Sequence, residues 1–169
     1  SVRPIKNVFV WGRDFEKAKA IAVALKNENF NIQPIKTIIE KISDVHIISC
    51  ATLSKTPLVF GKYLRKGQHI DLVGSYRKDM READDDTIKK ASVFVDTFQG
   101  GLKESGDIFI PLQNGALKES DIKADLFGLS SEAEPGRINA NEITLFKSVG
   151  HAIEDLAAAT YYYNKFKNE

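Results

Sequence analysis

Three short polar segments each follow an apolar run directly, and their side chains could bind or transform a ligand. Gly12–Asp14 follows KNVFVW, Thr52 follows VHIISCA, and Ser75 follows QHIDLVG. An arginine such as Arg13 can pair with a phosphate through two hydrogen bonds, whereas a carboxylate accepts hydrogen bonds from sugar hydroxyls. A glycine such as Gly74 lets a flat ligand approach the backbone closely. These residue types favour a nucleotide-like ligand.

A fourth polar turn, KSVG at 147–150, lies between the strand-like ITLF and a long helix with periodic apolar residues. The first backbone N–H groups of a helix have no partner within the helix, and the helix dipole is positive at that end. Such a turn suits an anion or a phosphate-bearing ligand. We therefore expect Ser148 and its neighbours to lie beside a bound ligand.

The elements that must position these segments can be predicted from hydrophobic patterning. Short runs rich in valine and isoleucine are typical of strands buried in a parallel sheet. They predict strands at 6–11, 29–33, 45–51, 68–73, 92–96 and 143–146, with a strand or extended link at 107–110. Helices are predicted after Asp14, near 37–42, at 84–91 and 99–104, twice within 117–126, and from about 150 to 166.

Strands that alternate with helices predict an α/β fold with a doubly wound, mostly parallel sheet of the Rossmann type. A dinucleotide-binding unit normally opens with a strand, a G-x-G-x-x-G turn and a helix. No such turn occurs here, and KNVFVWGRD is similar to the second strand of that unit. We therefore predict an incomplete Rossmann-type sheet that lacks its first βα unit and carries a long C-terminal helix.

This organisation predicts two parts of unequal size. Residues 1–146 would form a partial NAD(P)-binding domain, and 147–169 would form a C-terminal helix. The run Tyr161-Tyr162-Tyr163 extends around that helix, so we expect part of it to contact a missing domain or a partner subunit. Without the glycine-rich turn, we expect the isolated chain to bind NADPH weakly and to be inactive.

Composition limits the class of protein. The chain has 24 Lys and Arg against 23 Asp and Glu, a net charge of +1 and no long basic run, so we expect no nucleic-acid partner. No apolar run approaches the length needed to span a bilayer, so we expect no membrane partner. The three histidines show no metal-ligand spacing. The lone Cys50 and the lack of a secretory signal predict a cytoplasmic protein.

The choice of cofactor depends on two adjacent side chains with opposite preferences. Arg13 favours the 2′-phosphate of NADP, whereas Asp14 favours the free ribose of NAD. We favour NADP and keep NAD as the alternative. In a purely structural interpretation, Arg13 is a solvated loop residue and Asp14 only caps the following helix. Thr52 could likewise be a simple turn former rather than a cofactor ligand.

Four segments resemble corresponding parts of the ornithine cyclodeaminase/mu-crystallin family and together cover nearly the whole chain. They are VFVWGRDFEKA, ISCATLSKTPLVFGKYLRKGQHIDLVGSYRKDMREADDDTI, VFVDTFQGGLKESGDI and ITLFKSVGHAIEDLAAA. The resemblance implies an NAD(P)-dependent enzyme acting on small amino or imino acids. It also implies a second domain, built largely from an N-terminal half, through which a homodimer forms.

The resemblance also implies roles for residues at matching positions. It assigns the cofactor to Gly12, Arg13, Asp14, Thr52, Leu53, Val73, Gly74 and Ser148. Ser75 would face the substrate and Val149 would edge the substrate pocket, while Ser75, Tyr76 or a water molecule would supply a proton. No metal is implied. The substrate-binding arginine and lysine of the family would belong to the absent N-terminal half.

One departure from the family pattern bears on the substrate. Ornithine cyclodeaminases carry a catalytic aspartate at the position that is Tyr76 here, when the loops are aligned on Glu82. The pattern GSYRKDMRE is instead similar to the branch of ketimine and Δ1-pyrroline-2-carboxylate reductases. We therefore expect reduction of a small cyclic imino acid. Ornithine cyclodeamination, an alanine dehydrogenase-like activity and a non-catalytic, mu-crystallin-like binding role are the alternatives.

Overall fold

The computed structural model describes residues 3–26 and 29–167. The chain divides into two compact units, Ser1–Val45 and His46–Glu169, and each unit has its own parallel sheet. No helix among the described residues is long and apolar enough to cross a membrane.

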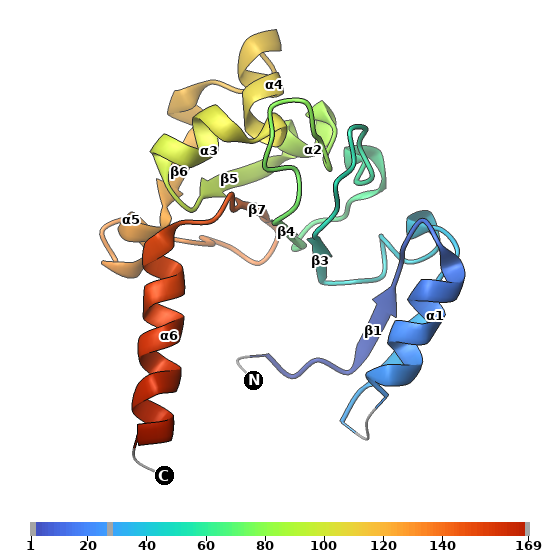
Figure 1. The fold of residues 1–169 in the computed structure, drawn as a ribbon. Helices are drawn as coiled ribbons and strands as arrows, with labels where there is room; N and C mark the ends of the chain where they lie inside the picture. The colour runs from blue at the N-terminus through green and yellow to red at the C-terminus, as the bar shows by residue number, and fades with distance from the viewer. Residues whose placement is uncertain (1–2, 27–28, 168–169) are drawn as a thin grey trace. The chain divides into compact units, whose positions relative to one another are not determined.

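The first unit is a βαβ arrangement (Figure 1). Its elements are β1 (Asn7–Val10), α1 (Phe15–Ala24), β2 (Asn31–Pro34) and the short 3₁₀ helix η1 (Ile38–Glu40). The two strands pair in parallel, with Asn7 opposite Asn31. Helix α1 begins after Asp14, whose side chain accepts the N–H groups of Glu16 and Lys17. The predicted cap and crossover are therefore confirmed, and Gly12–Asp14 lies at the carboxyl end of β1.

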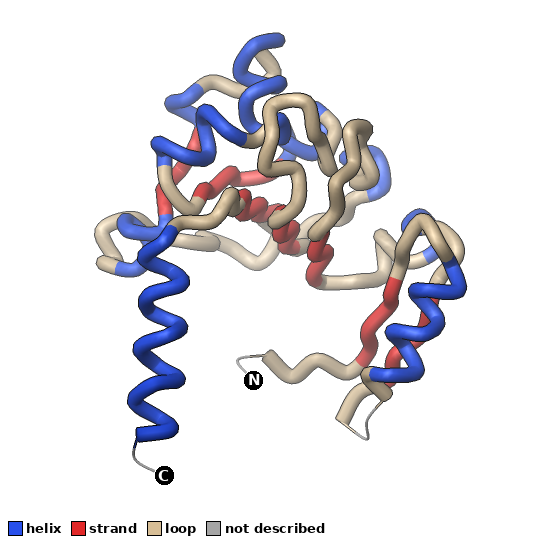
Figure 2. The backbone as a smooth tube through the Cα atoms, in the orientation of Figure 1, coloured by secondary structure: helices blue, strands red, loops and turns tan. Residues whose placement is uncertain are grey.

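The second unit contains a five-stranded parallel sheet in the order β3-β4-β7-β5-β6. Figure 2 shows the strands of the chain in red. The strands are β3 (Ile47–Cys50), β4 (His69–Leu72), β5 (Ala91–Val95), β6 (Ile122–Asp125) and β7 (Ile143–Lys147). The last strand of the chain thus lies at the centre of the sheet. It pairs with β4 on one side and with β5 on the other.

All five strands end at the same edge of the sheet. Cys50 is the partner of Leu72, Leu72 is the partner of Lys147, and Lys147 is also the partner of Val95. Val95 in turn is the partner of Asp125. Ligands of parallel α/β sheets bind outside this carboxyl edge, so the register brings the loops that follow β3, β4 and β7 to one place.

The other elements of the second unit are helices. They are η2 (Gly61–Tyr63), α2 (Asp85–Lys90), α3 (Phe98–Glu104), α4 (Gly106–Asn114), η3 (Glu119–Asp121), α5 (Leu126–Ser130) and α6 (Ala152–Lys167). The fully buried core contains Ile70 and Leu72 from β4, Leu145 from β7, and Ile108 from α4. The α/β class, the parallel sheet and the long final helix agree with the sequence-based predictions.

Two predicted elements are wrong. Residues 107–110 belong to helix α4, because Ser105 caps that helix through the N–H of Asp107 and because Ile108 faces the core. Two short helices were expected within 117–126; one is present as η3, but Ile122–Asp125 forms β6. Pairing with β5 and the alternation of buried and exposed side chains override the weak local preference there.

Helix α6 projects away from the sheet, and none of its residues is buried (Figure 1). Its exposed apolar side chains are Ile153, Leu156, Tyr161, Tyr162, Tyr163 and Phe166, each between 48% and 65% exposed. Most of the stability of a helix in a protein comes from tertiary packing of an apolar face, and the apolar residues of α6 have no such packing within the described residues.

Candidate functional site

The loops after β3, β4 and β7 are bound to one another at the carboxyl edge of the sheet. The N–H of Ser75 donates to the carbonyl of Thr52 at 3.1 Å, and the N–H of Ser148 donates to the carbonyl of Leu72 at 3.0 Å. Three of the segments singled out from the sequence, at Thr52, Val73–Ser75 and Ser148, are thus neighbours in space.

Gly74 lies in a position that has no room for a side chain. A Cβ atom at this residue would lie 2.1 Å from the carbonyl oxygen of Thr52 and 2.4 Å from Oε1 of Glu82. The glycine therefore allows the loop after β4 to contact the loop after β3 directly. Close approach of two backbones is the reason for a glycine here, which supports the interpretation that this loop is built to a fixed shape.

The side chain of Ser75 is directed into the protein. It is fully buried, and its hydroxyl donates to Oδ2 of Asp107 at 2.6 Å. Its backbone has a φ of 39°, in the left-handed region that few residues other than glycine adopt. Tyr76, in contrast, is 49% exposed. Among the predicted proton donors, this arrangement favours Tyr76 or a water molecule over the Ser75 hydroxyl.

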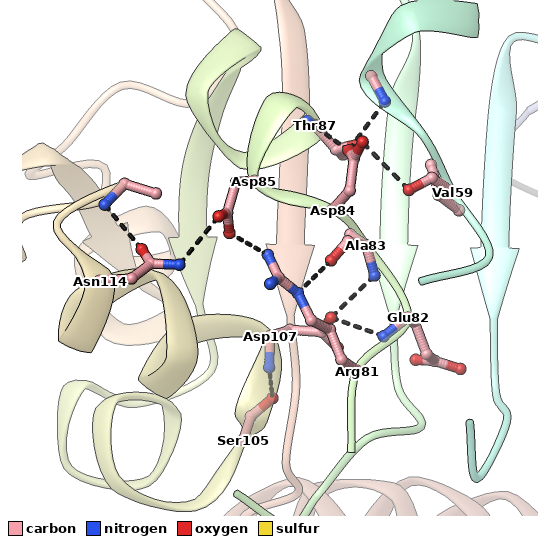
Figure 3. Close-up of polar contacts among 12 residues, drawn as sticks. Val59, Arg81, Glu82, Ala83, Asp84, Asp85, Thr87, Ser105, Asp107 and Asn114 are labelled. Atoms are coloured by element: carbon pink, nitrogen blue, oxygen red, sulfur yellow. Dashed lines mark hydrogen bonds and ion pairs between the residues drawn. The ribbon is translucent and has the colours of Figure 1, made fainter. Parts of the chain in front are cut away.

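A buried polar cluster lies beneath these loops, formed by Glu82, Asp107 and Lys147, each of which is fully buried. Figure 3 shows the Asp107 carboxyl group accepting the backbone N–H groups of Glu82 and Ala83, at 2.8 and 2.9 Å. Nζ of Lys147 donates to the carbonyl of Gly74 at 2.7 Å and lies 3.8 Å from Oδ2 of Asp107. The cluster thus joins the end of β7 to the loop after β4.

Glu82 connects the cluster to the loop after β3. Its Oε1 accepts the N–H of Thr52 at 2.6 Å, whereas its Oε2 has no hydrogen-bond partner within residues 3–26 and 29–167. Burial raises the pKa of the Glu82 carboxyl above its ordinary value, although the hydrogen bond from Thr52 opposes this. Burial also lowers the pKa of Lys147, and the nearby Asp107 opposes that change.

The turn at 147–150 does not offer free N–H groups to an anion, as the sequence had suggested. Oδ2 of Asp96 accepts the N–H groups of Val149 and Gly150 at 2.7 and 2.8 Å, and the hydroxyl of Ser148 at 3.2 Å. The protein's own carboxylate occupies this anion position. Asp96 directly follows β5, so it reaches the turn across the carboxyl edge of the sheet.

Other predicted site residues remain accessible along this edge. Leu53 is 63% exposed and Val73 is 48% exposed, so both present apolar surface on which a flat ring could lie. Val149 is partly buried, and a Cβ atom on Gly100 of α3 would lie 2.8 Å from its Cγ2.

Cys50 is buried, and burial raises the pKa of its thiol to about 12, as for an unreactive core cysteine.

The turn after β1 belongs to the first unit and is open to solvent. Arg13 and Asp14 are exposed, and a Cβ atom on Gly12 would meet only the carbonyl of Asp14, at 3.7 Å. Asp14 caps α1, as the structural interpretation predicted. The guanidinium of Arg13 is accessible from solvent.

The residues that sequence reasoning missed are Glu82, Asp96, Asp107 and Lys147. Two of them offered a signal, because Asp96 is the last residue of the predicted strand 92–96 and Lys147 directly follows the predicted strand 143–146. No group of three or more His, Cys, Asp or Glu side chains that could hold a metal ion occurs in the described part of the chain.

Comparison with known proteins defines the class. The whole chain, residues 1–169, matches the ornithine cyclodeaminase/mu-crystallin family, and it belongs to that family. It is 38% identical to a Δ1-pyrroline-2-carboxylate reductase of Colwellia psychrerythraea over 94% of this chain and 51% of the relative. The chain thus spans about half the length of the curated relatives it matches.

Two solved structures share the fold. A Δ1-pyrroline-2-carboxylate reductase of Thermococcus litoralis, in complex with NADH and L-proline, has a TM-score of 0.91 and 38% identity, over 97% of this chain and 51% of that one. An archaeal alanine dehydrogenase dimer with bound NAD has a TM-score of 0.88 and 25% identity, over 99% and 52%. These similarities confirm the predicted Rossmann-type fold.

Proposed function

We propose that the protein to which this chain belongs reduces a small cyclic imino acid of the Δ1-pyrroline-2-carboxylate type, with NADPH as hydride donor. The observation that carries the proposal is the loop Val73–Tyr76 at the carboxyl edge of the sheet. Its exposed side chains are Val73 and Tyr76, and Tyr76 stands where the family resemblance gives ornithine cyclodeaminases an aspartate. Relatives named as Δ1-pyrroline-2-carboxylate reductases support the same substrate class.

The residues of this chain suit a nicotinamide cofactor. We propose that Val73 and Gly74 line the nicotinamide ring, that Thr52 and Leu53 line the path to it, and that Ser148 lies beside its amide. Gly12, Arg13 and Asp14 would bind the adenosine ribose and its 2′-phosphate. When bound, the cofactor supplies the hydride, and the protein supplies position and electrostatics. The exposed Arg13 favours NADP, while NADH and NAD in the structural neighbours keep NAD as the alternative.

The reaction needs a hydride at the imine carbon and a proton at the imine nitrogen, which together convert C=N to CH–NH. We propose that Tyr76 or a water molecule beside it supplies the proton, since the hydroxyl of Ser75 is bound to Asp107. Ser75 would then contribute to the substrate site through its backbone. Val149 would form part of the wall against which the ring of the substrate packs.

The test is oxidation of NADPH by the full-length protein in the presence of Δ1-pyrroline-2-carboxylate, with L-proline as the product. Conversion of L-ornithine to proline and ammonia with NAD⁺, together with no turnover of the imine, would reverse the proposal in favour of a cyclodeaminase. Oxidation of L-alanine with NAD⁺ would favour the alanine dehydrogenase alternative. NADPH binding with no turnover of any of these substrates would favour a binding protein.

The exposed helix α6 supports a further part of the proposal, that residues 147–169 pack on a domain outside this chain and that the protein is a homodimer. No residue of α6 is buried here, and one structural neighbour is a dimer. Replacement of Leu156 and Tyr162 by serine should weaken dimers of the full-length protein in analytical ultracentrifugation. An unchanged dimer would exclude this role of α6.

We also propose that the protein is located in the cytoplasm. Cell fractionation tests this proposal.

A further inference from the structure

The buried cluster of Glu82, Asp107 and Lys147 takes no part in the proposed chemistry, and it is costly to maintain. Moving a charged side chain out of water is unfavourable unless other groups compensate it. All three side chains are fully buried, although they come from different elements. Glu82 accepts the N–H of Thr52, whereas Asp107 and Lys147 bind two consecutive residues, Ser75 and Gly74, in the loop that we assign to the nicotinamide.

Asp107 holds the side chain of Ser75. Its Oδ2 accepts the Ser75 hydroxyl at 2.6 Å, while its Oδ1 accepts two backbone N–H groups from the segment that leads into α2. Asp107 lies in the first turn of α4, where the helix dipole favours a negative charge. The carboxyl group is therefore fixed on both oxygens, and the hydroxyl it accepts is fixed with it.

Lys147 holds the backbone of Gly74, the residue that precedes Ser75. Its Nζ donates to the carbonyl of Gly74 at 2.7 Å and forms an ion pair with Oδ2 of Asp107 at 3.8 Å. Lys147 is the last residue of β7, the central strand of the sheet, which is paired on both sides. Hydrogen bonds to a charged donor in a buried site are stronger than those between neutral groups.

The conformation that these contacts hold is one that the loop would not adopt freely. The φ of 39° at Ser75 is unfavourable for a residue with a side chain. Such a conformation persists only where surrounding contacts enforce it, and here the hydroxyl of Ser75 and the carbonyl of Gly74 are both bound. Strained residues of this kind are concentrated at functional sites.

We propose that Lys147 and Asp107 are positioning residues, which hold Gly74–Ser75 in its left-handed turn and so fix the distance between the nicotinamide and the imine carbon. The proposal rests on the proposed function. Neither side chain is exposed, so each acts through the loop and not by touching a ligand. A displacement of about 1 Å in a reacting group can lower a rate by about 100-fold.

The experiment compares Lys147→Met with Lys90→Met in the full-length protein. Lys90 is a matched control, because its Nζ also donates to a glycine carbonyl, that of Gly61 at 2.9 Å, and pairs with Asp86 at 2.8 Å. It directly precedes β5, at the opposite edge of the sheet from the site. Removal of the same kind of contact there should leave the reaction unchanged.

We expect Lys147→Met to lower kcat for imine reduction by about 100-fold while the KM for NADPH changes by less than about 3-fold. The primary isotope effect with NADPH deuterated at the transferred position should rise, because hydride transfer becomes rate-limiting. A general loss of folded protein would lower the active fraction without changing the isotope effect. Lys147→Met with the wild-type kcat and isotope effect would overturn the proposal.

A second substitution that restores activity can separate the effect of the loop conformation from other effects of the buried cluster. Asp107→Asn should lower kcat by about 10-fold or more. Adding Ser75→Gly should recover part of that loss, because glycine adopts left-handed conformations without a hydrogen bond to hold it. Adding Ser75→Ala instead should recover nothing. Equal rates in the two double variants would contradict the positioning role.

Hydrogen exchange provides a readout that does not need the proposed activity. The N–H of Ser75 donates to the carbonyl of Thr52, so the loop should exchange slowly in the wild type. Lys147→Met should speed exchange at 74–76 by about 10-fold or more, whereas Lys90→Met should not. A wild type that turns over no imine would refute the proposed function alone. Unchanged exchange at 74–76 would refute the positioning role, whatever the activity.

Discussion

The turn after β1 and the loop after β4 stand at equivalent ends of parallel strands, yet they are built in opposite ways. Arg13 is exposed, and a Cβ atom added to the half-buried Gly12 would meet only the carbonyl oxygen of Asp14, at 3.7 Å. Gly74 and Ser75 are packed against the neighbouring loop and bound to two buried charges. The open turn can change its side chains without disturbing the fold, whereas the closed loop cannot.

This difference suits the two tasks that we assign to them. Recognition of a phosphate needs an exposed cation that can adjust to its ligand, and exposed loops tolerate substitution well. Transfer of a hydride needs fixed distances, which a catalytic loop achieves when rigid elements and surrounding hydrogen bonds support it. Cofactor preference should therefore be easy to alter in this protein, and the geometry of reduction should be hard to alter.

The sharpest test of the contrast between the two loops is to replace Gly12 and Gly74 in turn by alanine, which adds one methyl group at each position. Gly74→Ala places a Cβ atom 2.1 Å from the carbonyl oxygen of Thr52, so backbone must move. We expect this to lower the free energy of unfolding by about 1–3 kcal/mol or more. Gly12→Ala should change it by less than about 0.5 kcal/mol. Urea unfolding measures both, and similar losses for the two variants would contradict the contrast.

A second test concerns the open turn. Arg13→Gln should weaken NADPH binding by about 10-fold or more, because a charged hydrogen bond to the 2′-phosphate is lost. NADH binding should change by less than about 2-fold, because NADH lacks that phosphate. The exposed Lys17→Gln, in α1, is the matched control and should affect neither cofactor. Calorimetry with the full-length protein measures these affinities, and an equal loss for NADH and NADPH would argue against an NADP site.

The smallest expected effect concerns the carboxyl group of Glu82. Since burial raises its pKa above the ordinary value of 4.5, the folded state retains this proton at a pH where the unfolded chain has lost it. The stability that the group contributes is present below pH 4.5 and is lost as the pH rises through the raised pKa. Glu82→Gln keeps an acceptor for the N–H of Thr52 but cannot titrate.

The free energy of unfolding of the wild type should therefore decrease from pH 4.5 upward more steeply than that of Glu82→Gln. The exposed Glu104→Gln serves as a control that should follow the wild type. Denaturant unfolding across this pH range measures the difference. Parallel pH profiles for the wild type and Glu82→Gln would show that the buried carboxyl group does not titrate differently in the folded state.

Patterning in the sequence predicted most of the sheet and little of the polar interior. The runs around Ile48, Ile70 and Val93 are short, apolar and rich in β-branched residues, and such runs form buried parallel strands wherever helices cover them. The segment at 107–110 has a similar composition, yet it is a helix because Ser105 caps it. Composition cannot separate these two cases over so few residues.

The sequence by itself therefore determined the α/β class, the strands whose loops carry the candidate site, and the resemblance of the loop at Gly74 to a known family. Only the tertiary structure decided that Asp96 fills the anion position at 147–150, and that Lys147, Asp107 and Glu82 meet beneath Gly74 and Ser75. The reason is physical. Local patterns follow from the preferences of neighbouring residues, whereas these contacts join residues up to 73 positions apart, through a sheet order that places the last strand at its centre.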